Sequence, residues 1–360
     1  MRTLTQRERQ ILQLIQANPM ISQQELAEAL GITRSSVGVH ISNLSKKGYI
    51  AGKGYVLRSG SYCVVVGGVN VDIGGASFGA LVPADSNPGH VTVSLGGVGR
   101  NIAHNLCLLG ADVRLLTAFG DDMSAQKLAA SCGELGIDIS QALQVPGAAT
   151  STYLFLAGPD GDMELAVSDM DIYRHVTPAY LSARSALLDN AQLIIVDANI
   201  PVESIAWLAA NAKVPLFADP VSTTKAAKLK GSLGRLHTLK PNRIEAELLS
   251  GVPITGEESL HRCADTLLAT GLRRVFISLG GDGVFAADHS GRCLLPCLPA
   301  KMVNTTGCGD AFMAAIAWAY LEGTDLENTA RAGLAASAIA MESEETINPA
   351  MSVEALRKKL

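Results

Sequence analysis

The chain has 360 residues, of which 48% are apolar and 18% are charged, and its formal net charge is −5. This composition excludes intrinsic disorder for most of the chain, and the length predicts two domains or one large domain with an appendage. The longest apolar run, residues 311–321, is about half as long as a membrane span. No secretory signal is visible, and the scattered cysteines form no CxxC pair, so we expect reduced thiols in a cytoplasmic protein without membrane contact.

The charge is distributed unevenly along the chain. Residues 1–60 contain eight Lys and Arg against three acidic residues, whereas residues 61–360 contain 21 against 31. A basic head on an acidic body predicts two modules with different partners. Small polar residues follow Arg58, so we expect the domains to span residues 1–58 and 62–360.

The head is predicted to contain three helices and a short hairpin. Thr5 with Glu8 and Ser22 with Glu25 are capping-box patterns, and Thr33 opens a third helix over residues 34–47. Two short segments, residues 48–50 (GYI) and 54–57 (GYVL), flank a turn that contains Lys53, which predicts a basic wing.

This order of elements resembles the winged helix-turn-helix of bacterial regulators, in which the third helix enters a DNA major groove and the wing meets phosphate. The resemblance implies that residues 1–58 bind double-stranded DNA. A three-helix protein-interaction appendage with a solvated basic face is the alternative. The expected DNA-contacting residues are Arg34, Ser35, Ser36, Asn43 and Lys53.

The body alternates strands with amphipathic helices, which predicts an α/β fold with a parallel sheet covered on both faces. The main strands are expected at residues 62–66, 113–118, 193–196, 215–218 and 274–279. Shorter alternating segments at 91–94, 152–156 and 163–167 fit a small β-flap that could close over a substrate.

Two glycine-rich motifs directly precede predicted helices. The first covers residues 96–101 (GGVGRN), and its glycines let a ligand approach the backbone at a helix N-terminus. The second covers residues 305–312 (TTGCGDAF), where free amides suit a transferring phosphoryl group and Asp310 could accept a proton from a hydroxyl. The helix N-terminus should keep the Asp310 carboxylate ionised. Simple capping by Asp310 is the alternative.

Two further motifs are less specific. Residues 240–245 (KPNRIE) place Asn242 at a helix start and Glu245 one turn in, which fits either an ordinary capping box or contacts to a nucleotide and magnesium. Residues 278–283 (SLGGDG) fit either a hairpin or the edge of a nucleotide site.

In this order and spacing, the four motifs resemble the ribokinase-like (PfkB) carbohydrate kinase family over residues 62–350. Segments such as 84–89 (ADSNPG), 168–172 (SDMDI) and 237–242 (HTLKPN) are similar to the bacterial pseudouridine kinases of that family. The resemblance implies a parallel sheet between helices with a β-flap lid, phosphorylation of the 5′-hydroxyl of a nucleoside with ATP and Mg²⁺, and a homodimer.

The resemblance also assigns roles to residues. Asp310 would be the catalytic base and Thr306, Gly307, Cys308 and Gly309 the anion hole. Asp72 would grip sugar hydroxyls, with Gly96, Gly97, Asn101 and Asp169 completing the substrate site. ATP would be held by Asn242, Ser278, Gly280 and Gly283, and the waters of magnesium by Glu245.

Two positions depart from the family pattern. Asn304 stands where the motif usually begins with Asp, which puts activation by a monovalent cation such as potassium in doubt. Cys308 replaces a usual Ala and is interpreted as a buried thiol rather than a reactive thiolate.

Two alternatives to a pseudouridine kinase remain open. The chain could phosphorylate another nucleoside, ribose or a ketohexose. It could instead be a transcriptional regulator whose kinase fold only senses a ligand, although the intact Asp310, Gly307 and Gly309 argue against that.

Overall fold

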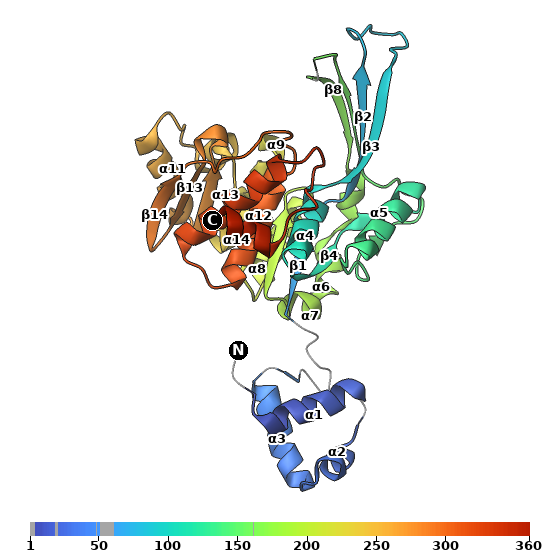
Figure 1. Ribbon diagram of the computed structural model, residues 1–360, viewed down its shortest axis with the longest axis vertical. Helices are drawn as coiled ribbons and strands as arrows, with labels where there is room; N and C mark the ends of the chain where they lie inside the picture. The colour runs from blue at the N-terminus through green and yellow to red at the C-terminus, as the bar shows by residue number, and fades with distance from the viewer. Residues whose placement is uncertain (1–3, 19–20, 48, 51–60, 161) are drawn as a thin grey trace. The chain divides into compact units, whose positions relative to one another are not determined.

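The computed structural model describes residues 4–18, 21–47, 49–50, 61–160 and 162–360. The chain forms two compact units, Met1–Ser61 and Tyr62–Leu360 (Figure 1). Within the described ranges, none of the helices combines the length and the hydrophobicity needed to cross a lipid bilayer.

The first unit contains the helices α1 (Gln6–Ala17), α2 (Gln23–Leu30) and α3 (Arg34–Lys46). Reciprocal capping boxes begin α1 and α2, and the Thr33 side chain accepts the Ser36 amide at the start of α3. These three helix starts are the ones that the sequence pattern predicts. Lys53 and the rest of the predicted wing beyond residue 50 lie outside the described residues.

An aliphatic core holds the three helices together. Ile11 and Ile15 of α1, Leu26 of α2, and Val37 and Leu44 of α3 are each fully buried. Beside this core, Lys47 forms an ion pair with the buried Glu8 at 2.7 Å. Glu8 lies in the first turn of α1 and Lys47 caps the end of α3, so the pair joins these two helices.

The second unit is built on an eight-stranded sheet in the order β14-β13-β12-β11-β10-β9-β1-β4. Six strands are parallel, and β13 and β14 form an antiparallel hairpin at one edge. The strands are β1 (Tyr62–Val66), β4 (Asp112–Leu116), β9 (Leu193–Asp197), β10 (Leu216–Asp219), β11 (Thr238–Leu239), β12 (Arg274–Ser278), β13 (Val284–Asp288) and β14 (Gly291–Leu295).

Helices cover both faces of this sheet, as the alternation of elements predicts. One face packs against α6 (Pro178–Ser182), α7 (Ser185–Asp189), α8 (Val202–Asn211), α10 (Arg243–Ser250) and α11 (Glu257–Ala269). The other face packs against α4 (Val98–Leu108), α5 (Met123–Glu134), α12 (Cys308–Leu321) and α13 (Leu326–Met341) (Figure 1). A final helix, α14 (Val353–Lys359), packs against α12 and α13.

A separate four-stranded sheet projects from this body and is called the flap here (Figure 1). Its strands, in spatial order, are β3 (Gly89–Gly96), β2 (Asn70–Ser77), β7 (Thr152–Ala157) and β8 (Met163–Asp169). The sequence predicts most of these strands. Two short strands, β5 (Ala118–Phe119) and β6 (Leu143–Gln144), pair apart from both sheets.

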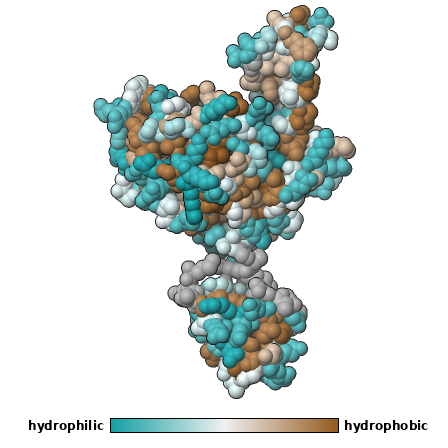
Figure 2. Space-filling view, in the orientation of Figure 1, coloured by the Kyte–Doolittle hydropathy of each residue, from teal (hydrophilic) through white to brown (hydrophobic). Residues whose placement is uncertain are grey.

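The strand register gives the flap two different faces. Asp72 lies opposite Ser94 and Tyr153, so these polar side chains share one face. The other face carries Val93 and Val167, which are 59% and 58% exposed. Figure 2 shows apolar residues on the surface of the flap. A sheet with one uncovered apolar face is a common mark of an interaction surface.

Candidate active site

Two helices begin with glycine N-caps near the carboxyl ends of the parallel strands. Gly97 precedes α4 with a φ of 99°, and Gly307 precedes α12 with a φ of 83°. Such positive φ values favour glycine, and neither residue has a side chain that could accept the first-turn amides. The Arg100 amide donates to the Gly68 carbonyl at 3.1 Å and the Cys308 amide to the Thr305 carbonyl at 3.3 Å, so each helix start offers only its remaining first-turn amides to a ligand.

The start of α4 fits tightly against the loop that follows β1. A Cβ at Gly97 would lie 2.5 Å from the Gly68 carbonyl oxygen, and one at Gly99 would lie 2.8 Å from the Gly67 carbonyl carbon. Only glycine permits this approach of backbone to backbone. The GGVGRN motif is thus a packing joint that brings Asn101 to a fixed place.

A direct contact joins α4 to α12. The Asn101 amide nitrogen donates to Asp310 Oδ2 at 2.8 Å. The other amide atom, Asn101 Oδ1, is buried and has no hydrogen-bond partner in the described part of the chain. Since buried polar atoms normally have partners, this oxygen is suited to accept a hydrogen bond from a bound ligand.

Asp310 has an unusual protonation equilibrium. Burial, reinforced by the nearby charge of Asp219, raises the pKa of its carboxyl to about 7, although the Asn101 hydrogen bond and Lys240 oppose the shift. The prediction that the helix N-terminus keeps this group fully ionised is therefore wrong. The loss of water around this partly buried carboxyl outweighs the helix dipole here, so its protonated form is populated near neutral pH.

Asp72 lies at the base of the flap, beside the GGVGRN motif. A Cβ at Gly96 would lie 2.1 Å from Asp72 Oδ2, so the absence of a side chain at that position makes room for the carboxylate. The Asn70 side chain donates to Asp72, and burial raises the pKa of the Asp72 carboxyl to about 6. The group is therefore mostly ionised at neutral pH and can accept hydrogen bonds from hydroxyls.

The structure does not bring Asp169 to this group. Asp169 pairs with Thr152 at the end of β8, and Thr152 pairs with Val71. Strand alternation then puts Asp169 on the flap face opposite to Asp72. Its role in binding substrate remains a prediction.

The loop before α12 is held by Asn304. Its side-chain oxygen accepts the Thr306 amide at 2.9 Å, and its amide nitrogen donates to the Glu344 carbonyl at 3.0 Å. A carboxylate could not donate the second bond, so the amide is what ties this loop to residue 344. Behind the loop, burial raises the pKa of Cys308, which agrees with the interpretation of a neutral thiol.

The predicted nucleotide residues lie next to one another on neighbouring strand ends. Asn242 and Glu245 form a reciprocal capping box on α10, with distances of 2.8 and 2.9 Å. Asn242 forms an isolated bridge with Ser278 at the end of β12, and the 280–283 turn follows. A Cβ at Gly283 would lie 2.0 Å from the Leu295 carbonyl oxygen, so this glycine is required by packing.

Sequence reasoning assigned no role to a buried charged group beside Asp310. Lys240, at the end of β11, forms an ion pair with Asp219 at the end of β10. Lys240 is the first residue of the KPNRIE motif, and Asp219 directly follows the strand predicted at residues 215–218. The available signal was that two charged residues follow buried strands that end at the same edge of a parallel sheet.

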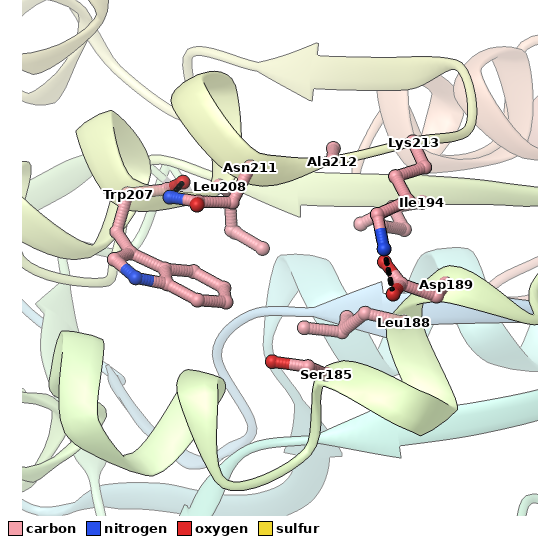
Figure 3. A pocket seen from close by; sticks show the side chains of 9 residues that line it. All are labelled: Ser185, Leu188, Asp189, Ile194, Trp207, Leu208, Asn211, Ala212 and Lys213. Atoms are coloured by element: carbon pink, nitrogen blue, oxygen red, sulfur yellow. Dashed lines mark hydrogen bonds and ion pairs between the residues drawn. The ribbon is translucent and has the colours of Figure 1, made fainter.

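A pocket near the opposite ends of the strands is a separate feature (Figure 3). It lies between α7 and α8 and includes Trp207. Three of its polar side chains are already partnered, because Lys213 pairs with Asp189 at 2.6 Å and Asn211 donates to the Trp207 carbonyl.

In the first unit, the predicted DNA-contacting residues occur at the start and along the length of α3. Arg34 and Ser35 are exposed, and Ser36 and Asn43 are partly exposed. The hydroxyls of Ser35 and Ser36 lie 3.0 and 2.8 Å from the Thr33 hydroxyl, so both take part in the helix cap.

Comparisons with known proteins agree with this division of the chain. A family model described as pfkB family carbohydrate kinase matches residues 61–353, and one described as winged helix-turn-helix DNA-binding matches residues 4–51. An uncharacterised sugar kinase of Escherichia coli K12, YeiI, is 38% identical over 98% of both chains. The pseudouridine kinase of the same organism is 40% identical over 82% of this chain and 96% of its own.

A solved structure supports the same fold. The ribokinase of Arabidopsis thaliana, solved with ribose and ATP, superposes with a TM-score of 0.75 at 22% identity. The match covers 84% of this chain and 99% of the ribokinase. The predicted ribokinase-like α/β fold is confirmed.

Proposed function

The chain belongs to the pfkB family of carbohydrate kinases and is a sugar or nucleoside kinase, and we propose that it phosphorylates the 5′-hydroxyl of pseudouridine with ATP. The oxygen of that hydroxyl forms a bond to the γ-phosphorus while the bond from this phosphorus to the β,γ-bridging oxygen breaks. ADP leaves, and the hydroxyl proton passes to Asp310.

The contact between Asn101 and Asp310 is the observation that carries this proposal. It fixes one oxygen of the base and leaves the other to face a hydroxyl. The same Asn101 side chain holds an unpartnered buried oxygen, so one residue can orient both the base and the substrate. The first-turn amides of α12, beyond Gly307, would receive the transferring phosphoryl group.

Asp72 would fix the sugar from the flap side. Its carboxylate lies against Gly96 and is ionised at neutral pH, which suits a pair of sugar hydroxyls. Asn242, Ser278, Gly280 and Gly283 would hold the nucleotide, since they lie at adjoining strand ends.

Ribokinase-like kinases use ATP with Mg²⁺, and the residues here fit such a pair. Among the described residues, no group of three or more His, Cys, Asp or Glu is placed to hold a metal ion. Magnesium would therefore be bound mainly by phosphate oxygens, with Glu245 holding its waters. The ion would neutralise phosphate charge. Burial raises the pKa of the Glu245 carboxyl, and a nearby cation would favour its ionised form.

The choice of pseudouridine rests on the pseudouridine kinase that is 40% identical over 82% of this chain. Another nucleoside, ribose or a ketohexose is the alternative for the same machinery. The test is ADP release with ATP and magnesium on a panel of pseudouridine, uridine, ribose and fructose, with Asp310→Asn as the background control. The largest kcat/KM for pseudouridine is expected. A larger value for ribose or fructose would replace the nucleoside, and no turnover with any acceptor would contradict a kinase.

We propose a second function for the head, which is binding of double-stranded DNA. The supporting observations are the matching winged helix-turn-helix family, the basic charge of residues 1–60, and the exposure of Arg34 at the start of α3. The acidic body would repel phosphate, so binding must come from the head.

The test uses the full chain in anisotropy titrations with DNA from upstream of its own gene. Arg34→Ala should weaken binding by about 1–3 kcal/mol if this side chain reads a base. Arg262→Ala, which removes an exposed arginine from α11, is the charge-matched control and should change little. Unchanged binding by Arg34→Ala, or none by the parent chain at low salt, would favour the interaction appendage. A parent chain that binds DNA but turns over no acceptor would favour the ligand-sensing regulator.

The uncovered flap face supports a homodimer. Val91, Val93 and Val167 would be buried against a second copy, and a Val93→Lys substitution should then shift the sedimentation coefficient from dimer to monomer. A monomeric parent chain would contradict this. The seven unpaired cysteines support a reducing, cytoplasmic location.

A further inference from the structure

Lys240 is a buried lysine for which the proposed chemistry has no role. It follows β11, and its side chain is only 9% exposed. Its ammonium nitrogen lies 3.1 Å from Oδ2 of Asp219, whose side chain is 6% exposed. Burying an ion pair costs desolvation free energy, so such a pair needs a reason beyond stability.

The ammonium of Lys240 reaches the start of α12. A Cβ built at Gly309 would lie 3.2 Å from Lys240 Nζ. The missing side chain at Gly309 thus leaves room for a positive charge beside the first turn of this helix. Asp310, the next residue, is within range of that charge.

We propose that Lys240 is a positioning residue, held in place by Asp219, that stabilises the ionised carboxylate of Asp310 and so keeps the base ready to accept a proton. The inference rests on the proposed role of Asp310. It adds a residue that does not touch the reacting hydroxyl and acts only through its charge.

The charges around Asp310 explain why such a residue is needed. Asp219 from the end of β10 and Asp197 from the end of β9 both raise the pKa of Asp310, in addition to burial. Asn101 from α4 and Lys240 from β11 lower it. Cys308, on the same helix turn, is neutral because burial raises its pKa. Without Lys240, the Asp310 carboxylate would face the carboxylates of Asp219 and Asp197, and only the Asn101 hydrogen bond would stabilise its ionised form.

Lys240 itself stays charged in this environment. Burial opposes its protonated form, but Asp219, Asp310 and Glu245 together raise its pKa above the ordinary value. The cation is therefore present over the whole pH range in which Asp310 titrates.

The experiment measures the pH dependence of kcat/KM and the titration of Asp310 by isotope-edited NMR of the aspartate carboxylates, with Asp310→Asn to assign its signal. Lys240→Met leaves Asp219 buried and unpaired, and the variant could fail to fold. The decisive pair is therefore Asp219→Asn and the double variant Asp219→Asn with Lys240→Met. These two variants differ only at position 240, and neither leaves a buried Asp219 carboxylate without its ion-pair partner.

We expect Asp219→Asn to move the acidic limb of the profile to lower pH, because a repelling charge is gone. Adding Lys240→Met should move the limb back up by about one pH unit, which is about a tenfold loss of rate at pH ~6 with little change at pH ~9. A purely structural role would lower the rate equally at every pH. Coincident profiles and NMR titrations for the two variants would overturn the proposal.

Arg274→Met is the matched control. Arg274 forms a similarly buried pair with Asp288 at 3.0 Å, but it begins β12 and lies at the other end of the strand from Ser278. This variant should lose stability without moving the Asp310 titration. If Asp310→Asn keeps full turnover while the NMR titration still depends on Lys240, the proposed base is wrong and the charge relation stands. If Asp310→Asn keeps full turnover and the NMR titration does not depend on Lys240, both the proposed base and the proposed role of Lys240 are wrong.

Discussion

The two glycine-rich helix starts, α4 and α12, look alike in sequence but differ in the structure. At α4, Gly97 and Gly99 press against the backbone of residues 67–69. At α12, Gly309 is exposed, and a Cβ there would meet only the end of the Lys240 side chain. The first is a joint closed by packing. The N-cap of α12 is closed as well, because a Cβ at Gly307 would lie 2.1 Å from the Thr346 carbonyl oxygen, but Gly309 leaves the first turn of this helix open to a ligand.

This difference explains how the site can hold its side chains rigidly and still leave room for a ligand. The closed joint fixes Asn101, and Asn101 then fixes Asp310 on the open helix through a 2.8 Å hydrogen bond. Preorganised groups of this kind stabilise a transition state without moving during the reaction. A glycine motif therefore signals a close approach, but the approaching partner can be either the protein or a ligand.

The largest effect is expected when the proposed base on α12, the Asp310 carboxylate, is removed. Asp310→Asn keeps the size of the side chain and the Asn101 contact within reach, but it cannot accept the proton. Turnover should fall by roughly 10²–10⁴-fold, the usual share of general-base catalysis, with nucleotide binding mostly kept. Steady-state ADP release and a nucleotide titration measure the two effects. Parent-like turnover would remove Asp310 from the mechanism.

A pair of glycine substitutions separates the two helix starts directly. Gly97→Ala places a Cβ 2.5 Å from the Val69 Cα at a φ of 99°, so it should lower the free energy of unfolding by at least about 1–3 kcal/mol. Gly309→Ala meets only the end of the Lys240 side chain at 3.2 Å, with no backbone atom in the way, and should change the melting temperature little while reducing turnover. Thermal denaturation compares them, and equal melting temperatures would show that the closed and open descriptions do not hold.

A carboxylate pair tests the two faces of the flap. Asp72→Ala should raise the substrate constant about ten- to a hundred-fold, because a charged hydrogen-bond acceptor is worth roughly 1.5–3 kcal/mol. Asp169→Ala, on the opposite face, is the matched control and should have a small effect. The KM values for substrate and for ATP, measured for both variants, show which carboxylate binds substrate. An equal loss in Asp169→Ala would return that residue to the substrate site.

The last test leaves the sequence unchanged and varies the pH. A base must be deprotonated, and burial holds the pKa of Asp310 at about 7, so kcat/KM should rise as the pH increases through that value. Below it the rate should fall about tenfold per unit, and more steeply once Asp72 also protonates near its own value of about 6. A profile that is flat from pH ~5 to ~8 would mean that neither carboxyl controls the rate.

Much of the fold could be predicted from the sequence. Capping patterns at Thr5 and Ser22 gave the helix starts of the head, and buried strand segments gave the parallel sheet. These features are local, because a cap or an alternating strand depends on residues close together in the chain. The motif order likewise led to the family that the comparisons show.

Three features were decided by the tertiary structure. The Asn101–Asp310 contact spans 209 positions, the capping box of Asn242 and Glu245 turned out to adjoin Ser278, and strand register put Asp169 and Asp72 on opposite faces. Sequence spacing alone cannot bring such distant residues into contact, because their approach depends on how strands and helices assemble.

The two modules and the type of most elements follow from local sequence patterns, and so do the residues that could carry phosphoryl transfer. Only the tertiary structure decided the protonation of Asp310, because its pKa depends on burial and on Asp219, Asp197 and Lys240, which arrive from three other strand ends. Electrostatic free energies depend on distance and on the loss of water, and both are set when the strands come together in one sheet.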